Sequence, residues 1–600
     1  MDKQSTLGLI LIFVLLVAWM MWNSPQTKQP QVKNQKQEIV NDSVKTAVSQ
    51  AEKKEIAARE KQSANTADQS AGKYFEARKK GTERIITIES DSYKAELSTK
   101  GGLIKTWELK KFKSWDGVPV QLVDYDHKGD LTILLTTSDG KVINTRDLYF
   151  DANVPDGHVV LNKENNYEFE ISFTLPSTNG GKLIKTMKFR NGEYGLDLDI
   201  QLINLAPVVA NYEYELAWES GIRYAERNSV DEANFGAAYA YAGNELADVD
   251  AKQVDKKEQK DFSGAIDWIA VRNKYFGIVL IPVSTLSDGA YIEGSRKAMP
   301  NEGVYETYNI SLKMPFKGGD NEHAAFKIFM GPLDHGILSS YKINLEKIMN
   351  LGWAWIIRPI SEYIMLPVFS AIHYIVPNWG FVIIIFSLLI KLVLHPLSKK
   401  QMESMKRMQK LQPMMDEIRE KYKDDPQKMN SSIMNLYKEY GVNPAGGCLP
   451  LLLQLPIMYA LFAVLRGSIQ LRQAGFIWWI KDLSVPDVIV TLPFRLPILG
   501  QDLSGIVLVM GISMFFQSKM TITDPRQKAT VWMMPIMMTL VLNSLPSGLN
   551  LYYAMFNILA IGQQLLINKK HNDEPLRKIE PKKKKRGGFL ARLPQMPKAK

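Results

Sequence analysis

Residues 379–397 read WGFVIIIFSLLIKLVLHPL, a run whose strongly polar residues are Ser387, Lys391 and His395. The run has the length of a transmembrane helix. An ionisable side chain at the centre of such a helix costs about 2.5–3.5 kcal/mol on insertion scales, so Lys391 is a candidate functional residue. Ser387 and His395 lie four residues before and after Lys391, so a helix would place all three on one face.

Four further apolar runs follow this one, and together they predict a helical membrane core at residues 378–567 with five spans. They are residues 449–465, 503–516 (the shortest), 531–545 and 549–567. Near the N-terminus, residues 7–22 carry no charge and no small-x-small cleavage site follows them. We therefore interpret residues 1–22 as an N-terminal transmembrane anchor rather than a cleaved signal peptide, which makes six spans in all. The linker 546–548 predicts an antiparallel hairpin of the last two spans.

The last span carries a polar stripe, because Asn550, Asn557 and Gln564 recur every seven residues with Tyr553 on the same side. Gln454 adds a polar group to the second span of the core. Lipid excludes polar stripes, so we expect these residues to face one another or a water-filled cavity. The alternative is that the amides only join helices and that the Lys391 ammonium reaches the membrane surface.

The position of Lys391 weakens that alternative, because a continuous helix would place about 9 Å between it and Leu397. The spans contain no Asp or Glu. Coupled transporters and pumps usually need buried carboxylates, so a lone cation favours attraction of an anionic group over ion coupling.

The net charge of +11 is concentrated in two segments and predicts the topology. Residues 398–448 hold 10 Lys and Arg against 7 Asp and Glu, and residues 568–600 hold 12 against 3. The positive-inside rule places both segments in the cytoplasm. Both termini are then cytoplasmic, and the region before residue 340 lies outside.

Residues 78–340 alternate apolar and polar side chains in many short stretches, which predicts an all-β sandwich. The predicted strands include residues 84–90, 131–137, 167–175, 194–204 and 211–220. Asp197 and Asp199 are interpreted as part of a solvated sheet face. The polar segment 247–260 is expected to be a surface loop. Residues 23–77 are interpreted as a flexible tether, because residues 23–73 contain no aromatic residue.

Two segments outside the spans have helical periodicity. Residues 341–377, interrupted by Pro359 and Pro367, are expected to form an interfacial amphipathic helix. Residues 398–444 predict a helical hairpin that turns at residues 424–426. One of its faces is rich in methionine, a residue that adapts to varied apolar partners, and is a candidate substrate contact: Met402, Met405, Met408 and Met415. The alternative is that these residues pack on the hairpin itself.

Composition excludes several classes of protein. The single cysteine, Cys448, rules out a disulfide framework and multi-cysteine zinc sites. The 7 His contain no HExxH motif, so we expect no metal or cofactor. A cation cluster in the basic tail is a candidate contact for the ribosome or for anionic lipids: Lys582, Lys583, Lys584, Lys585 and Arg586. No aromatic residues interleave with it, so specific DNA binding is not expected.

The order of segments, and a set of short motifs between about residues 377 and 570, resemble the YidC membrane protein insertases of Gram-negative bacteria. The motifs are Asn378-Trp379-Gly380, His395-Pro396-Leu397, Leu411-Gln412-Pro413, Gly446-Gly447-Cys448, Gln454-Leu455-Pro456, Met514-Phe515-Phe516-Gln517, Pro546-Ser547-Gly548 and Tyr552-Tyr553. The region before residue 340 is similar to the family only in size and strand content.

The resemblance implies a non-enzymatic insertase and chaperone of the bacterial inner membrane. It implies a hydrophilic groove, open to cytoplasm and lipid, in which a cation receives the polar end of a substrate. That cation falls on Lys391, where many members have Arg. Other groove positions carry over to Ser387, Gln454 and Tyr553, and on spacing to Asn557 and Gln564. The implied partners are nascent membrane proteins, the Sec translocon and the ribosome.

Two other functions remain open from the sequence. One is a transporter or flippase for an anionic solute or lipid, with Lys391 as its binding group. The absence of evident inverted repeats argues against it. The other is a membrane-anchored periplasmic protein that binds or cleaves carbohydrate, which would need paired carboxylates in a cleft if it were catalytic.

Overall fold

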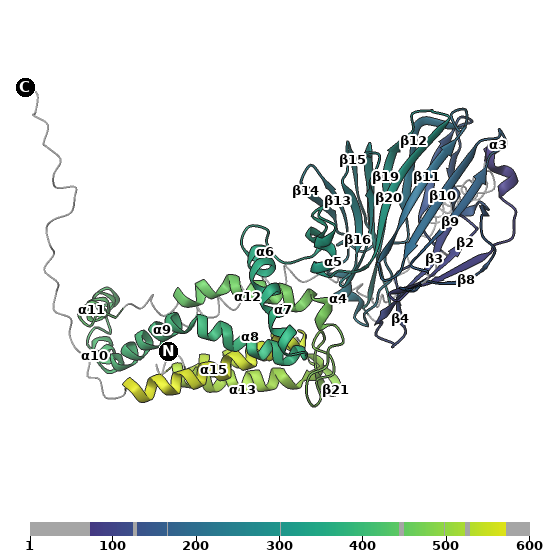
Figure 1. Cartoon of the computed structure of the whole chain (residues 1–600). Helices are drawn as coiled ribbons and strands as arrows, with labels where there is room; N and C mark the ends of the chain where they lie inside the picture. The colour runs from purple at the N-terminus through teal and green to yellow at the C-terminus, as the bar shows by residue number, and fades with distance from the viewer. Residues whose placement is uncertain are drawn as a thin grey trace, which may run out of the picture. The chain divides into compact units, whose positions relative to one another are not determined.

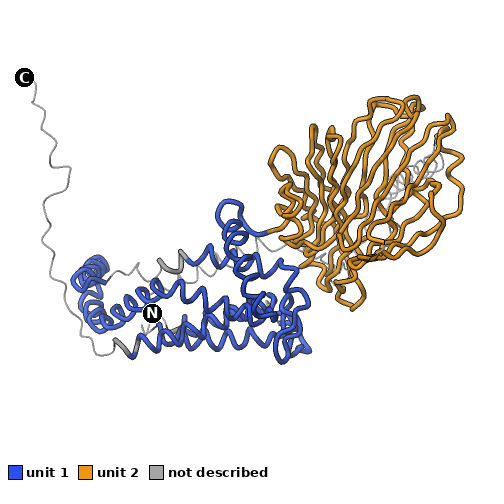
Figure 2. The backbone as a smooth tube through the Cα atoms, viewed as in Figure 1, with its two compact units in different colours: residues 1–10, 351–600 blue, residues 11–350 orange. Residues whose placement is uncertain are grey.

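The computed structural model describes residues 72–123, 129–164, 166–300, 302–442, 449–496, 499–522 and 528–571. It contains two compact units, residues 11–350 and residues 1–10 with 351–600 (Figure 2). The predictions for the N-terminal anchor 1–22, for most of the tether and for the Lys582–Arg586 cluster lie outside the described residues, as does the Gly446-Gly447-Cys448 motif.

The first unit is built from three antiparallel or mixed sheets (Figure 1). The five-stranded sheet has the order β4-β3-β2-β1-β8, with β1 Ile85–Glu89, β2 Tyr93–Ser98, β3 Leu103–Lys113, β4 Pro119–Gln121 and β8 Gly157–Val160. The six-stranded sheet has the order β15-β18-β19-β12-β5-β6, with β5 Thr132–Thr137, β6 Val142–Asn144, β12 Val209–Trp218, β15 Lys257–Ser263, β18 Gly289–Ala298 and β19 Val304–Pro315.

The largest sheet has nine strands in the order β14-β13-β16-β17-β20-β11-β10-β9-β7. Its strands are β7 Asp151–Ala152, β9 Glu168–Pro176, β10 Lys182–Arg190, β11 Gly195–Ile203, β13 Ala237–Ala242, β14 Glu245–Val249, β16 Trp268–Arg272, β17 Phe276–Pro282 and β20 Asn321–Pro332. Short helices flank the sheets: α3 Gly72–Phe75, η1 Glu76–Arg78, η3 Thr145–Asp147, α4 Ser229–Ala233, α5 His335–Ser340 and η4 Leu345–Ile348.

The all-β prediction is confirmed, because all five predicted strands are present within a few residues of their expected bounds. The alternation that predicted them is visible as burial: in β11 every second side chain faces the core. The sheets share an aromatic core, in which the Tyr93 and Trp107 rings stack at 4.2 Å and Phe189 packs beside them from another sheet. Asp197 pairs with Arg190 and Lys327 on the partly solvated face, as interpreted.

Two predictions about this unit need correction. Residues 247–260 form a loop only between β14 and β15, because both ends of this segment belong to those strands. These strands lie at sheet edges, where charged side chains are favoured since they prevent pairing with another chain. The tether also ends earlier than residue 77. Phe75 is fully buried and the Tyr74 hydroxyl lies 2.7 Å from Ser138 Oγ, so residues 72–78 belong to the folded unit.

A buried lysine connects two sheets of this unit. Lys185 on β10 is fully buried, and its Nζ donates to the backbone carbonyls of Gly102 and Leu131, each at 2.6 Å. Burial lowers the pKa of Lys185 to about 7, and nearby Asp130 opposes that shift. The side chain therefore satisfies two buried carbonyls but is easily deprotonated.

The helical unit begins after residue 350. Its helices are α6 Ile357–Ile360, η5 Ser361–Met365, α7 Leu366–Ile375, α8 Trp379–Val393, α9 His395–Lys410, α10 Gln412–Lys421, α11 Pro426–Glu439, α12 Leu449–Gly467, η7 Ile469–Leu471, α13 Gly505–Thr521, α14 Lys528–Leu542 and α15 Ser547–His571. A two-stranded hairpin, β21 Val488–Leu496 with β22 Gly500–Ser504, lies between α12 and α13. The predicted interfacial helix is narrower than residues 341–377, since residues 345–348 belong to the first unit.

The first core span is shorter than predicted. α8 ends at Val393, and α9 continues at an angle of 64°. Pro396 causes the break, because it has no N–H to donate to residue 392 and its ring would clash with that carbonyl. Lys391 therefore lies in the last turn of α8. The argument from a continuous helix of about 9 Å between Lys391 and Leu397 therefore fails, because the helix is broken between these residues.

Length and apolarity single out one bent pair of helices. Within the described ranges, no helix taken alone is both long and apolar enough to cross a membrane, whereas the bent pair α8–α9 could do so by length and composition. The last two predicted spans, α14 and α15, are consecutive and joined by a short turn. Each of them packs mainly on α13 and not on the other, so α13 is the central helix of this group.

The helical hairpin predicted at residues 398–444 is present as α9, α10 and α11. Asp425 begins α11 as its N-cap, accepting from the Lys428 N–H at 3.0 Å, and Pro426 occupies the first turn. A small core joins α10 to α11: Leu411, Met415, Leu436, Tyr440 and Val442. The turn was thus predicted correctly.

Lys185 generates a prediction for the stability of the β unit. Its pKa is about 7 when folded and 10.5 in its ordinary state. Between these values the unfolded chain binds more protons, so stability should rise with pH from about 7 toward 10. Lys185→Met should flatten this rise and lower stability by about 1–3 kcal/mol, because two buried carbonyls lose their donor.

Urea denaturation of residues 72–350 at several pH values measures both effects. Lys182→Met is the matched control, since Lys182 is exposed on the same strand. Equal pH slopes in the wild type and in Lys185→Met would contradict the prediction.

Candidate functional site

Lys391, one of the residues predicted for the groove, lies where α8 and α9 meet α15. Among the described residues, three pairs of side chains illustrate this contact. The rings of Phe386 and Tyr552 are 6.4 Å apart, Lys391 Nζ lies 4.3 Å from the centre of the Phe556 ring, and His395 Nδ1 lies 3.1 Å from Gln563 Nε2.

The order of these contacts gives the direction of the helices. Along α8 and α9 the partners are residues 386, 391 and 395, and along α15 they are 552, 556 and 563. Both sets of numbers increase together, so α8 and α15 run parallel. α8 is the first and α15 the fifth of the core helices. If each core helix crosses the same layer once, successive helices alternate in direction, so the first and the fifth run parallel.

Lys391 is buried and has no anionic neighbour in the part of the chain that the structure describes. Its residue exposure is 8%. Among the described residues it makes no hydrogen bond or ion pair, and the contact it does make is with the face of the Phe556 ring. A cation over an aromatic face is stabilised by the ring quadrupole, which partly replaces the missing counter-ion. The site can therefore attract a carboxylate or a carbonyl dipole.

The other predicted residues differ in their surroundings. Ser387 is fully buried, one turn from Lys391, and its hydroxyl donates to the Ile384 carbonyl at 2.7 Å. Gln454 on α12 and Asn557 on α15 are half-buried, and Gln564 is buried. Tyr553 is half-buried, and its ring meets that of Tyr552 edge-on at 5.6 Å.

One residue of the predicted polar stripe has a structural role. Asn550 is fully buried, and its amide donates to the carbonyls of Leu542 and Leu545, each at 3.1 Å. Leu542 is the last residue of α14, and Leu545 lies in the turn that follows, where its N–H also donates to the Leu542 carbonyl at 3.1 Å. Asn550 therefore closes the turn before α15 and does not belong with Asn557 and Gln564.

The sequence analysis did not identify Phe556 or Gln563 as parts of the site. Phe556 lies four residues after Tyr552, so both share one face of α15, and their rings stack at 5.8 Å. That spacing was visible in the sequence, but apolar spacing in a helix usually indicates ordinary packing. Gln563 is identified only by its contact with His395 across the two helices.

The four methionines of the hairpin are not equivalent. Met415 is 5% exposed in the core between α10 and α11, where it accepts a contact from the Tyr437 hydroxyl at 3.3 Å. Met408 packs against the same core. Met402 and Met405 on α9 are half-buried. Met415 and Met408 therefore pack within the hairpin itself. Met402 and Met405 stay candidate contacts for a substrate.

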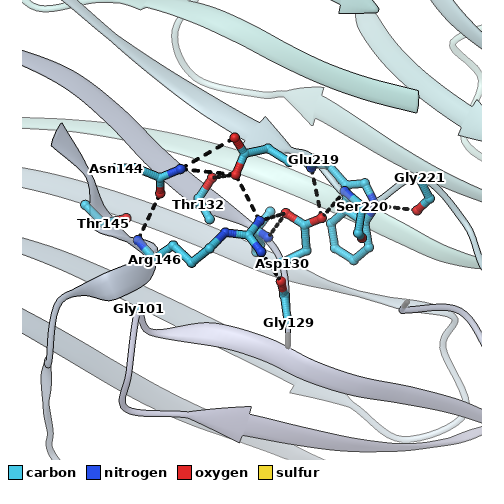
Figure 3. Close-up of polar contacts among 12 residues, drawn as sticks. Gly101, Gly129, Asp130, Thr132, Asn144, Thr145, Arg146, Glu219, Ser220 and Gly221 are labelled. Atoms are coloured by element: carbon cyan, nitrogen blue, oxygen red, sulfur yellow. Dashed lines mark hydrogen bonds and ion pairs between the residues drawn. The ribbon is translucent and has the colours of Figure 1, made fainter. Parts of the chain in front are cut away.

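The β unit contains a carboxylate pair, Asp130 and Glu219, joined by Arg146 (Figure 3). Asp130 is fully buried and accepts from the backbone N–H groups of Leu131, Glu219 and Ser220 at 2.6–2.8 Å. Burial raises the pKa of Asp130, and Arg146 opposes this. Both carboxylate oxygens of Asp130 accept hydrogen bonds from the protein itself. We therefore interpret the pair as a structural link between neighbouring segments of the β unit and not as a catalytic pair.

Two family models cover most of the chain. Residues 85–362 match the YidC periplasmic domain, and residues 371–574 match the 60Kd inner membrane protein family. The boundary between the two matches is close to the boundary between the two structural units at residue 350.

Full-length relatives show the same family. The chain is 40% identical over 582 residues to the membrane protein insertase YidC of Chlorobaculum parvum, covering 96% of each chain. It is 39% identical to that of Chlorobium phaeovibrioides, covering 98% of this chain and 100% of the relative. A crystal structure of an active YidC insertase aligns with 20% identity and a TM-score of 0.34, covering 82% of this chain and 93% of that one. With both domain models and these relatives matched along its whole length, the chain belongs to the YidC family of membrane protein insertases, proteins of the inner membrane with a periplasmic domain.

Proposed function

We propose that this chain inserts membrane proteins by receiving a polar or acidic substrate segment beside Lys391, in a groove bounded by α8, α12 and α15. The observation that carries this proposal is a buried ammonium, over Phe556, without an anionic partner among the described residues. A substrate carboxylate supplies the missing counter-charge. The apolar segment that follows it can then pass into lipid.

Neighbouring polar side chains support this route. Gln454, Tyr553 and Asn557 are half-buried, and within the described part of the chain they make no hydrogen bond to one another. Their polar atoms are available to a substrate backbone as it leaves water. Since the five core helices contain no Asp or Glu, a substrate carboxylate meets no competing anion there.

The proposed topology has six spans, with both termini cytoplasmic and the β unit periplasmic. The charge distribution of the sequence and the parallel direction of α8 and α15 support it. We also propose that α9–α11 and the basic tail contact nascent chains, the ribosome, the Sec translocon or anionic lipids on the cytoplasmic side.

The main prediction concerns Lys391. In cells depleted of the protein, insertion of a small single-span substrate with a short acidic periplasmic tail should fail. Wild type and Lys391→Arg should restore it, because both keep the positive charge, while Lys391→Ala and Lys391→Glu should lower it several-fold. Protease accessibility of the substrate tail measures insertion. Lys519→Ala is the matched control, because Lys519 is an exposed lysine in the last turn of α13.

Normal insertion in depleted cells would overturn the proposed function. Normal insertion with Lys391→Ala and Lys391→Glu would show that insertion does not depend on the positive charge at residue 391. A substrate whose tail carries no carboxylate should be less sensitive to both variants, which separates charge recognition from damage to the bundle.

The hairpin generates a second prediction. Met402→Ser with Met405→Ser should reduce photo-crosslinking of a nascent substrate to α9 and leave the hairpin folded. Met415→Ala should instead lower the stability of the hairpin, by about 2 kcal/mol or more, because it removes a buried side chain. Hydrogen exchange over residues 411–442 distinguishes the two effects. Unchanged crosslinking in the double variant would remove α9 as a substrate contact.

A third prediction concerns the β unit. Deleting residues 72–350 removes a complete folded unit, whereas cutting inside it would expose its core. The helical unit has its own packing, so insertion of the acidic-tail substrate should stay within about two-fold of wild type. A loss as large as that of Lys391→Glu would show that the β unit takes part in insertion.

A further inference from the structure

The hairpin of β21 and β22 exposes apolar side chains on both of its faces. Val488, Ile489 and Val490 are consecutive and 44–48% exposed, and Phe494 is 56% exposed. Successive side chains of a strand point to opposite faces, so β21 exposes apolar atoms on both of its faces. An apolar edge of this kind in water promotes association between chains, and proteins normally protect it.

The exposed apolar side chains of the hairpin lie on one strand, whereas polar side chains lie on both. β22 presents the exposed polar side chains Gln501 and Asp502, and Asp502 accepts a hydrogen bond from Thr491 at 2.7 Å. β21 presents the apolar side chains together with the exposed Thr491 and Arg495. This mixture suits an element lying at a boundary between water and an apolar medium, because the long arginine side chain can extend its charge to the polar side.

The hairpin is firmly attached to the ends of the core helices. Asp487 precedes β21 and accepts from the Ile506 N–H at the start of α13 at 2.8 Å, and from Trp479 Nε1 at 2.8 Å. Asn543, just after α14, donates to the carbonyls of Leu499 and Asp502. These bonds position the hairpin at the end of the bundle where α12 ends and α13 begins. In Figure 1, β21 lies at the end opposite α10 and α11.

A tryptophan pair lies beside the hairpin. The rings of Trp478 and Trp479 stack at 5.6 Å, and Trp478 is 83% exposed. A Cβ atom on Gly505 would lie 2.7 Å from Trp479 Nε1 and 2.9 Å from Ile489 Cγ2, so Trp479, β21 and α13 pack closely at this glycine. Tryptophan concentrates at the boundary between lipid headgroups and acyl chains.

The apolar surface continues from the hairpin onto α13. Val509, Ile512 and Phe516 are 44–59% exposed and recur along one side of that helix. In an inner-membrane insertase such a helix face lies against lipid. The chain passes from β22 into α13 without a break, at Ser504 and Gly505. The surface beside β21 is thus an extension of a lipid-facing surface.

We propose that the β21–β22 hairpin and the Trp478–Trp479 pair lie in the bilayer, at the headgroup–acyl boundary of the leaflet where α12 ends and α13 begins. In the proposed topology this is the periplasmic leaflet. β21 enters the lipid and β22 faces the water. The hairpin holds the start of α13 and the end of α14 at a fixed depth, through Asp487 and Asn543.

Single-cysteine labelling of the full chain tests this. Cys448→Ser removes the one native cysteine. An environment-sensitive fluorophore is then attached at Ile489→Cys or Phe494→Cys. Gln501→Cys on the paired strand is the matched control, Val142→Cys in the β unit reports water, and Ile512→Cys on α13 reports lipid. The proteins are reconstituted into vesicles of phosphatidylethanolamine and phosphatidylglycerol, with doxyl-labelled lipid or aqueous iodide as quencher.

Labels at residues 489 and 494 should be quenched by doxyl lipid as strongly as the label at residue 512, and by iodide several-fold less than the label at residue 142. The label at residue 501 should respond to iodide. Iodide quenching at residues 489 and 494 equal to that at 142 would overturn the proposal. Protection from both quenchers would also overturn it, since a protein surface would then cover the strand. Insertion activity is not a readout, so either outcome leaves the test of Lys391 unaffected.

Discussion

A positive charge without a counter-charge is the constraint on which the helical unit depends. Lys391 is 8% exposed, and the core helices provide no carboxylate to pair with it. Removing an ammonium from water is expensive unless something replaces its hydration. Here the Phe556 ring provides part of the compensation. The remaining demand for a negative or polar partner is the basis of the proposal that Lys391 receives a substrate segment.

The position of Lys391 depends on the break between α8 and α9. Pro396 ends the first helix, so the lysine lies in its last turn and close to the bend. The bend also turns His395 toward Gln563 on α15. A straight helix through residue 397 would keep the lysine deep in a continuous span. The bent helix places the lysine beside the junction of the two helices instead.

The two units satisfy their buried polar groups in different ways. In the β unit, Lys185 and Asp130 are bonded to backbone groups and to Arg146, so these charges hold strands together. In the helical unit, the bonds of Asp487, Asn543 and Asn550 gather at helix ends, where backbone groups lack helical partners. Among the described residues, Lys391 and Asn557 make no such bond to a backbone group. We use this difference to distinguish candidate binding groups from structural ones.

The sequence by itself determined the kinds of element and the main candidate residue. Period-two alternation identified the β unit, apolar runs identified the core helices, and Lys391 stood out because charge is rare in such runs. Tertiary structure alone decided which polar residues are structural. Asn550 and Asn557 lie seven residues apart on one helix, yet Asn550 binds the end of α14, because the chain before it turns there. It also decided that Met415 is covered while the apolar strand β21 is not. Periodicity shows that a side chain shares a face with others, but only the neighbouring elements show whether that face meets protein, lipid or substrate.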